Sequence, residues 1–166
     1  MHMEETVKAK PPDVQALKQN EKKWTPTLMK AGWSAFPNII IEKQRALGLD
    51  AMDMNILLHL VQYWWLEENV PHPSVATIAE AIGVTPRAIQ KRVTALQAAG
   101  LITREERRHS KFGSQTNLYR FDGLIAACKP FAEEKVAAAK KKAEEDKARV
   151  KRKKPKLVVN NDTPGS

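Results

Sequence analysis

Four hydrogen-bonding side chains at helical spacing are the clearest candidates for chemistry with a partner molecule. Gln90, Lys91 and Thr94 follow Arg87 by three, four and seven residues, which places all four on one side of a helix. Arg and Lys can donate hydrogen bonds to guanine O6 and N7, Gln can bond to adenine, and Thr can contact a base or a phosphate. These residue types at this spacing indicate a surface suited to reading the edges of base pairs.

Other kinds of chemical site have little support in the sequence. The histidines lack the paired spacing of metal ligands, and the chain has a single cysteine, Cys128. Neither of the glycine-rich phosphate-binding motifs, GxxxxGK[ST] and GxGxxG, occurs. We therefore expect no metal, no cofactor and no enzymatic activity. The histidines are His2, His59, His72 and His109.

Charge is distributed unevenly along the chain, whose formal net charge is +9. Residues 50–84 contain five acidic and no basic residues, whereas residues 85–121 contain eight basic and two acidic residues, a net charge of +6. The change falls at the start of the segment that carries Arg87. A basic face on an otherwise mixed domain is typical of proteins that bind polyanions, and ordinary solvated charge is the alternative explanation.

Two helices joined by a tight turn would hold the four donors in place, in the stretch "IAEAIGVTPRAIQKRV" and its flanks. Ser74 is the expected N-cap of a helix over Val75–Ile82, and Gly83 forms the turn. Thr85 is the expected N-cap of a second helix, which has Pro86 at its first position and ends near Ala99. Ile89, Val93 and Leu96 would form the buried side of the second helix, with Ile89 and Val93 against the first helix. The exposed side would then present Thr85, Pro86, Arg87, Gln90, Lys91 and Thr94 to the major groove of DNA.

A β-hairpin is predicted after the second helix, which Gly100 ends. Residues 101–108 and 115–121 have the pattern of two strands around a tip that contains Gly and Ser. Basic and polar side chains suited to phosphates or to the minor groove gather in this region. The residues expected to contact the DNA backbone are Arg92 on the helix and Arg104, Arg107, Arg108, His109, Lys111 and Ser114 on the hairpin.

The N-terminal third is expected to lead into the domain. Residues 1–23 are rich in Lys, Glu and Pro and are predicted to be disordered. Three aromatic residues that follow are expected to dock on the core. A short helix over Ile39–Leu47 would be capped by Asn38 and would end at Gly48, and a longer helix over Ala51–Leu66 would be capped by Asp50. The three aromatic residues are Trp24, Trp33 and Phe36.

Beyond Asp122 the sequence is helical again, with Pro130 as a punctuation point. An exposed charged helix is predicted over residues 129–152, and its apolar stripe is too rich in alanine to predict a coiled coil. A disordered basic tail over 153–166 would add non-specific affinity for DNA through counterion release. The predicted domains are thus 1–23, 24–128, 129–152 and 153–166.

The segment "PSVATIAEAIGVTPRAIQKRVTALQAAGLITREERR" resembles the winged helix-turn-helix of MarR- and GntR-type regulators. Together with "GWSAFPNIIIEKQRALGLDAMDMNILLHLVQYW" before it and "NLYRF" after it, the chain is most similar to a helix-turn-helix family of plasmid, phage and mobile-element proteins, including replication initiators. The resemblance covers residues 32–121 and implies binding to double-stranded DNA. GntR-type proteins add an effector domain after the wing, whereas a charged helix follows here, which argues against a small-molecule effector.

The sequence therefore predicts a mainly α-helical winged helix-turn-helix with a small β-hairpin wing. We expect a sequence-specific DNA-binding protein that acts as a transcriptional regulator and forms a homodimer on a two-fold site. An initiator or accessory factor for plasmid or phage replication is one alternative, and a winged helix that binds only proteins is another. Because the apolar runs are far shorter than the about 20 residues of a membrane span and no secretion signal is evident, we expect no membrane partner and a cytoplasmic location at the bacterial nucleoid.

Overall fold

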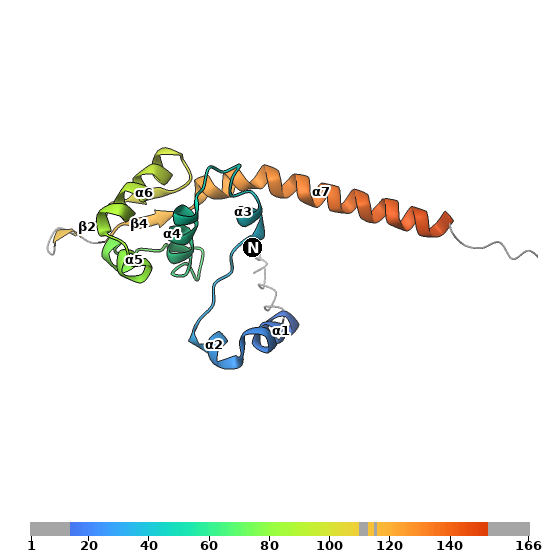
Figure 1. The fold of residues 1–166 in the computed structure, drawn as a ribbon, viewed down its shortest axis with the longest axis horizontal. Coiled ribbons are helices and arrows are strands. Elements are labelled where there is room, and N and C mark those ends of the chain that lie inside the picture. Colours follow the sequence, from blue (N-terminus) through green and yellow to red (C-terminus); the bar gives the residue numbers. More distant parts are fainter. Residues whose placement is uncertain (1–13, 110–112, 115, 153–166) are drawn as a thin grey trace, which may run out of the picture.

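The computed structural model describes residues 14–109, 113–114 and 116–152 of the 166-residue chain. The described part is mainly helical, with a small antiparallel hairpin between the sixth and seventh helices (Figure 1). The predicted fold class is confirmed. In chain order the elements are α1 (Val14–Trp24), α2 (Pro26–Ala31), α3 (Asn38–Glu42), α4 (Ala51–Val61), α5 (Val75–Ile82), α6 (Pro86–Ala98), β1 (Thr103–Glu105), β2 (Arg108–His109), β3 (Gly113–Ser114), β4 (Leu118–Arg120) and α7 (Asp122–Arg152).

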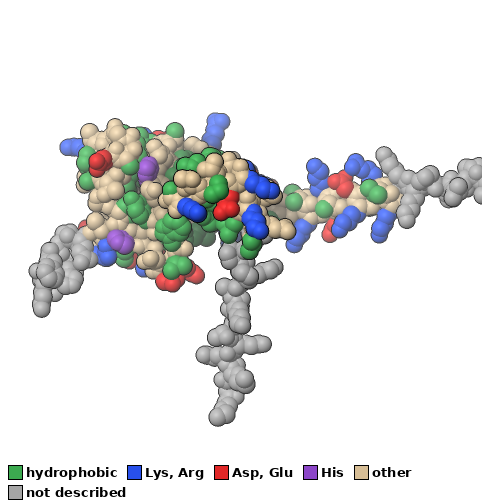
Figure 2. Space-filling view, turned by 90° about the horizontal axis from the view of Figure 1, so that it is seen from below, with side chains coloured by type: hydrophobic (Ala, Val, Ile, Leu, Met, Phe, Trp, Pro, Cys, Tyr) green, Lys and Arg blue, Asp and Glu red, His purple; other side chains and the backbone are tan. Residues whose placement is uncertain are grey.

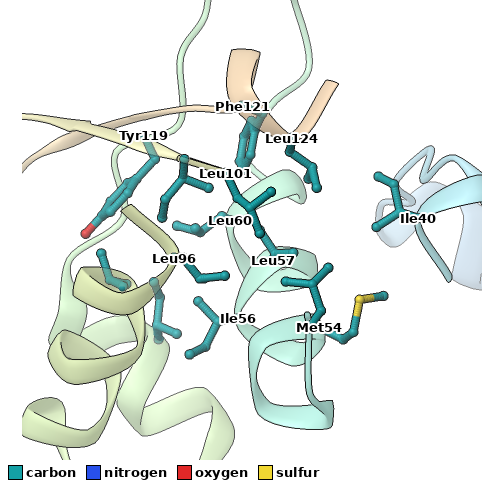
Figure 3. Close-up of a cluster of buried hydrophobic side chains, with 14 of the residues drawn as sticks. Ile40, Met54, Ile56, Leu57, Leu60, Leu96, Leu101, Tyr119, Phe121 and Leu124 are labelled. Atoms are coloured by element: carbon teal, nitrogen blue, oxygen red, sulfur yellow. The ribbon is translucent and has the colours of Figure 1, made fainter. Parts of the chain in front are cut away.

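The hydrophobic core lies where α4, α5 and α6 pack against one another and the hairpin closes over them. Tyr119 and Phe121 reach this core from the hairpin, and Leu124 and Cys128 reach it from the first turns of α7. Figure 3 shows side chains of α4 meeting those of α6, of the hairpin and of α7, with Ile40 of α3 on the far side of α4. Full burial of each large apolar side chain stabilises the fold by roughly 1.5–3 kcal/mol. The core therefore joins segments that are far apart in the sequence.

The predicted caps of the central helices are confirmed. Asp50 and Asp53 form a capping box at the start of α4, in which each side chain accepts the other's backbone N–H at 2.9 and 3.0 Å. Ser74 caps α5, and its hydroxyl accepts the N–H of Thr77 at 3.0 Å. Helix α4 ends at Val61 and not at Leu66, because the chain tightens into i→i−3 hydrogen bonds and Trp64 turns to stack on Phe121, with ring centroids 5.2 Å apart.

The hairpin consists of two short antiparallel ladders and not of two continuous strands. Strand β1 pairs with β4, with Arg104 opposite Tyr119, and β2 pairs with β3 nearer the tip. Between the ladders, the guanidinium of Arg107 donates to the carbonyl oxygen of Thr116 at 2.9 Å and to its hydroxyl at 3.1 Å. A side chain thus bonds to a carbonyl between the two ladders, where continuous strands were expected.

The structure corrects the prediction of disorder for residues 14–23, which lie in α1; residues 1–13 are outside the described range. Eight of the eleven residues of α1 are Gln, Lys, Glu, Ala or Leu, which favour helix, and α1 contacts α2 while burying none of its own residues. Trp24 and Trp33 do not dock on the core, since 59% and 44% of their surfaces are exposed. Of these three aromatic residues, Phe36 alone packs against the core, because it lies two residues before α3, the first element that joins the core.

Two further boundaries differ from the sequence-based expectations. The N-cap of α3 is Pro37, which is extended and makes no side-chain capping bond, whereas Asn38 is the first helical residue. Helix α3 stops at Glu42, and turns continue through Gly48. Helix α7 runs through Pro130 without a break, so the predicted domain boundary after Cys128 falls inside a helix. Pro130 is exposed, where water can satisfy the carbonyl that loses its bond.

Candidate nucleic-acid interface

Helix α6 has one buried side and one polar side. Ile89 and Val93 are completely buried and Leu96 is almost so, because they face α4 and α5. The structure brings all six residues predicted for the major groove to the start and the outer side of this helix, and all six are exposed. They are Thr85, Pro86, Arg87, Gln90, Lys91 and Thr94. The local geometry therefore matches a helix that packs on one side and offers hydrogen-bond donors on the other.

The turn before α6 exposes the start of this helix. Gly83 has a φ of +81°, a conformation that other residues adopt at a cost. The N–H groups of Gly83 and Val84 both donate to the carbonyl oxygen of Ala79, at 2.9 and 3.0 Å. Thr85 then caps α6, and its hydroxyl accepts the N–H of Ala88 at 3.2 Å. Since Ala79 is small and buried, α5 and α6 can approach each other closely around the turn.

Arg92 is engaged within the domain, although the sequence analysis assigns it to the DNA backbone. Its guanidinium forms an ion pair with the carboxylate of Asp50 and lies 3.6 Å from the carboxylate of Asp53. This cluster ties α6 to the capped start of α4. The signal was present in the sequence, because Arg92 is three residues after Ile89 and four before Leu96, at the edge of the buried side.

The same cluster lowers the pKa of Asp50 below its ordinary value of 3.8, mainly because the backbone N–H of Asp53 donates to the carboxylate. Burial acts in the opposite direction, and the bond from Arg92 adds to the lowering. The ionised carboxylate is therefore the form that the folded domain favours.

We expect Asp50→Ala to destabilise the domain more than Asp50→Asn. Alanine loses the cap, which is worth about 1 kcal/mol, whereas asparagine keeps the cap and loses only the pairing with Arg92, worth at most about 1 kcal/mol at this exposed end.

The lowered pKa of Asp50 means that the charged form stabilises the fold above the pKa of the unfolded chain and that this contribution is lost as the pH falls. In urea denaturation, the free energy of unfolding of Asp50→Asn should be lower than that of wild type at pH 7, and this difference should be smaller at pH 3. An equal difference at pH 7 and pH 3 would contradict the role of the charge.

The structure places the residues predicted for the wing in three situations. Arg107 braces the hairpin through Thr116. Arg104 lies close enough to Tyr119 for its positive charge to act on the phenol, whose pKa is raised by burial and partly lowered again by this charge. The backbones of Arg108, His109 and Ser114 belong to the outer ladder, and Lys111 lies outside the described residues. The predicted DNA contacts of these residues stay predictions.

The sequence analysis did not predict two ion pairs, one within the hairpin and one between α3 and α7. Arg120 binds Glu105 across β1 and β4 at 2.6 Å, which adds to the pairing of the inner ladder. Lys135 of α7 binds Glu42 of α3, also at 2.6 Å. Both pairs join segments distant along the chain, so no local pattern predicts them. They also remove Arg120 and Lys135 from the set of unpaired cations.

Features of other functional classes are few in the described part of the chain. No group of three His, Cys, Asp or Glu side chains suited to holding a metal occurs among the described residues. Cys128 is buried, which raises the pKa of its thiol and disfavours the reactive thiolate. None of the described helices combines the length and the apolar character that crossing a membrane requires.

Comparison with known families agrees with the geometry. Residues 47–102 match the family model described as a helix-turn-helix domain, and the match begins before α4 and ends after α6. No curated protein matches the chain. The match covers α4, α5 and also α6, whose outer side bears the exposed donors. Residues 47–102 are thus similar to a helix-turn-helix domain, and this similarity supports a helix-turn-helix DNA-binding unit in this part of the chain.

Proposed function

We propose that the protein binds double-stranded DNA in a sequence-specific manner, with the exposed side of α6 in the major groove and the hairpin wing on the backbone. We further propose that it acts as a transcriptional regulator of a nearby operon and binds as a homodimer to a two-fold-symmetric site. The helix-turn-helix family supports the DNA partner. The choice of regulator over replication factor is our own proposal.

The observation that carries this function is the contrast between two groups of cations. Arg92, Arg107 and Arg120 each have an acceptor within the domain. Among the described residues, neither Arg87 nor Lys91 has an ion-pair partner, although both stand on the exposed side of α6. Unpaired cations beside a helix N-terminus are suited to an external anion. The donors Gln90 and Thr94 between and beyond them are suited to base edges.

A winged helix that binds only proteins is less well supported by this surface. The exposed side of α6 carries polar and charged side chains, whereas the centre of a protein interface is depleted of charge. Under that alternative, removing the charges of Arg87 and Lys91 would leave function intact.

Selection from a random pool of duplex oligonucleotides by the purified full chain tests the proposal. We expect an enriched motif with two-fold symmetry, because a homodimer presents two copies of α6. A motif in direct repeats, located beside a replication origin, would favour the initiator and count against the regulator. Recovery of no motif would contradict sequence-specific binding. Footprinting on the promoter of the protein's own operon then tests whether the site is regulatory.

A further inference from the structure

The second half of α7 is a helix without a partner in the described structure. The first turns of α7 join the core through Leu124 and Cys128, and Lys43 lies over the ring of Phe131 at 5.3 Å. Beyond Lys135 the helix leaves the domain and projects into solvent, as Figures 1 and 2 show. Residues 136–152 extend for about 25 Å at the usual rise of a helix. Val136 and Val150 in this part have 55% and 69% of their surfaces exposed.

An apolar stripe runs along this helix at the spacing of a helix–helix interface. Its members alternate at intervals of four and three residues, which keeps them on one side of the helix. Asp146 interrupts the stripe and is held by Arg149 at 2.7 Å. A partner must therefore meet one polar position, which is a common way to fix register. The members are Ala132, Val136, Ala139, Ala143, Asp146 and Val150.

The charges beside this stripe are almost all of one sign. At heptad spacing, six positions border the stripe, and five of them are Lys or Arg. Lys135 binds Glu42 and Arg149 binds Asp146, so that the bordering cations without an ion pair among the described residues are Lys140, Lys142 and Lys147. The acidic residues Glu134, Glu144 and Glu145 lie away from it on the helix. The bordering positions are Glu133, Lys135, Lys140, Lys142, Lys147 and Arg149.

The charges beside the stripe determine which kind of helix can pack on it. Two copies of α7 would bring the cations of one stripe against those of the other, which destabilises such a pair. An acidic helix would instead place carboxylates opposite the cations on both edges. Because three of the six stripe positions are alanine, the stripe lets a partner approach closely but buries little area, so the affinity depends strongly on these charges.

The position of α7 separates this surface from the DNA-binding side. The projecting helix leaves the domain at the end opposite to the hairpin wing, so α6 and the wing stay free when α7 is occupied (Figure 1). An apolar stripe also contributes nothing to phosphate contacts, which are made by donors and cations. We propose that residues 132–150 of α7 form a docking surface for an acidic amphipathic helix of a partner protein, separate from the DNA interface.

Binding of two designed helical peptides to the full chain tests this proposal. Both peptides carry Leu along one stripe; the acidic peptide has Glu at every bordering position and the basic peptide has Lys there. By calorimetry, the acidic peptide should bind about tenfold or more tightly than the basic one, and the preference should weaken with added salt. The double variant Val136→Glu, Val150→Glu should bind the acidic peptide about tenfold more weakly than wild type does. Lys140→Glu with Lys142→Glu and Lys147→Glu should reverse the preference.

Several outcomes would overturn the proposal. Equal binding of both peptides, or binding that the Val136→Glu and Val150→Glu changes do not affect, would show that the stripe is not a helix-docking surface. A dimer that those two changes dissociate would make a second copy the occupant. A loss of affinity for the selected DNA duplex in the same variant would assign this part of α7 to DNA. Unchanged DNA affinity, with loss of the acidic peptide, would support the proposal independently of the regulatory role.

Discussion

Replacing Gly123 with alanine is expected to destabilise the domain by about 3 kcal/mol, because the added methyl group collides with backbone. A Cβ atom at Gly123 would lie 1.8 Å from the carbonyl oxygen of Gly100 and 3.2 Å from that of Leu101. These atoms cannot turn away as a side chain can, and the neighbouring N–H of Leu124 is bonded to the Leu101 carbonyl at 2.7 Å. The start of α7 would have to move away from the end of α6. Urea denaturation of the purified variant measures the effect.

The expected change in the free energy of unfolding of Gly123→Ala has the opposite sign to the change that helix propensity predicts. Glycine to alanine at an open helical position stabilises by about 1 kcal/mol, so helix propensity alone predicts the opposite result. Ala126→Ser is a matched control, since Ala126 is exposed in the same part of α7, and it should change stability by less than about 0.5 kcal/mol. A Gly123→Ala variant as stable as wild type would show that α7 does not approach α6 as closely as described.

Replacing both Arg87 and Lys91 with alanine is expected to weaken binding to the selected DNA duplex by about 100-fold or more. Loss of a contact to a base costs about 1–3 kcal/mol, and the two side chains are exposed on the same side of α6. Stability should change little, since neither residue contributes to the core. Fluorescence anisotropy on the selected duplex and on an unrelated duplex of equal length separates contacts to bases from contacts to the phosphate backbone. The unrelated duplex should lose much less affinity.

Two control variants give this experiment its reference points. Because we expect Arg104 to contact a phosphate, Arg104→Ala should lower the affinity for both duplexes equally. It should also reduce the slope of log affinity against log salt concentration by about one unit. Lys141→Ala, on the exposed projecting helix, should leave both affinities unchanged. An Arg87→Ala and Lys91→Ala variant that binds the selected duplex as wild type does would overturn the assignment of α6 to the major groove.

Where the sequence analysis succeeded, the controlling forces act over a few residues. Ser74, Thr85 and Asp50 are predicted as caps because each side chain satisfies a backbone N–H three positions ahead, and all three do so. The division of α6 into a buried and an exposed side follows from its helical period. The candidate residues of the major-groove surface could therefore be placed without any knowledge of the tertiary fold.

Tertiary structure alone decided which cations stay unpaired, which aromatic residues are buried and where α7 goes. The sequence analysis assigns Arg92 and Arg107 to DNA by their residue type, yet their partners are Asp50 and Thr116. The helical period places Arg92 at the edge of the buried side, but it does not identify Asp50, which lies 42 residues away along the chain, as the partner. Trp24 stays exposed although it is apolar, because burial depends on whether the packed elements leave room for a side chain. The sequence by itself determined the helix-turn-helix and its exposed donors, since caps and periodicity are local. Long-range packing determined the rest, since a contact between distant segments depends on the geometry of the whole core.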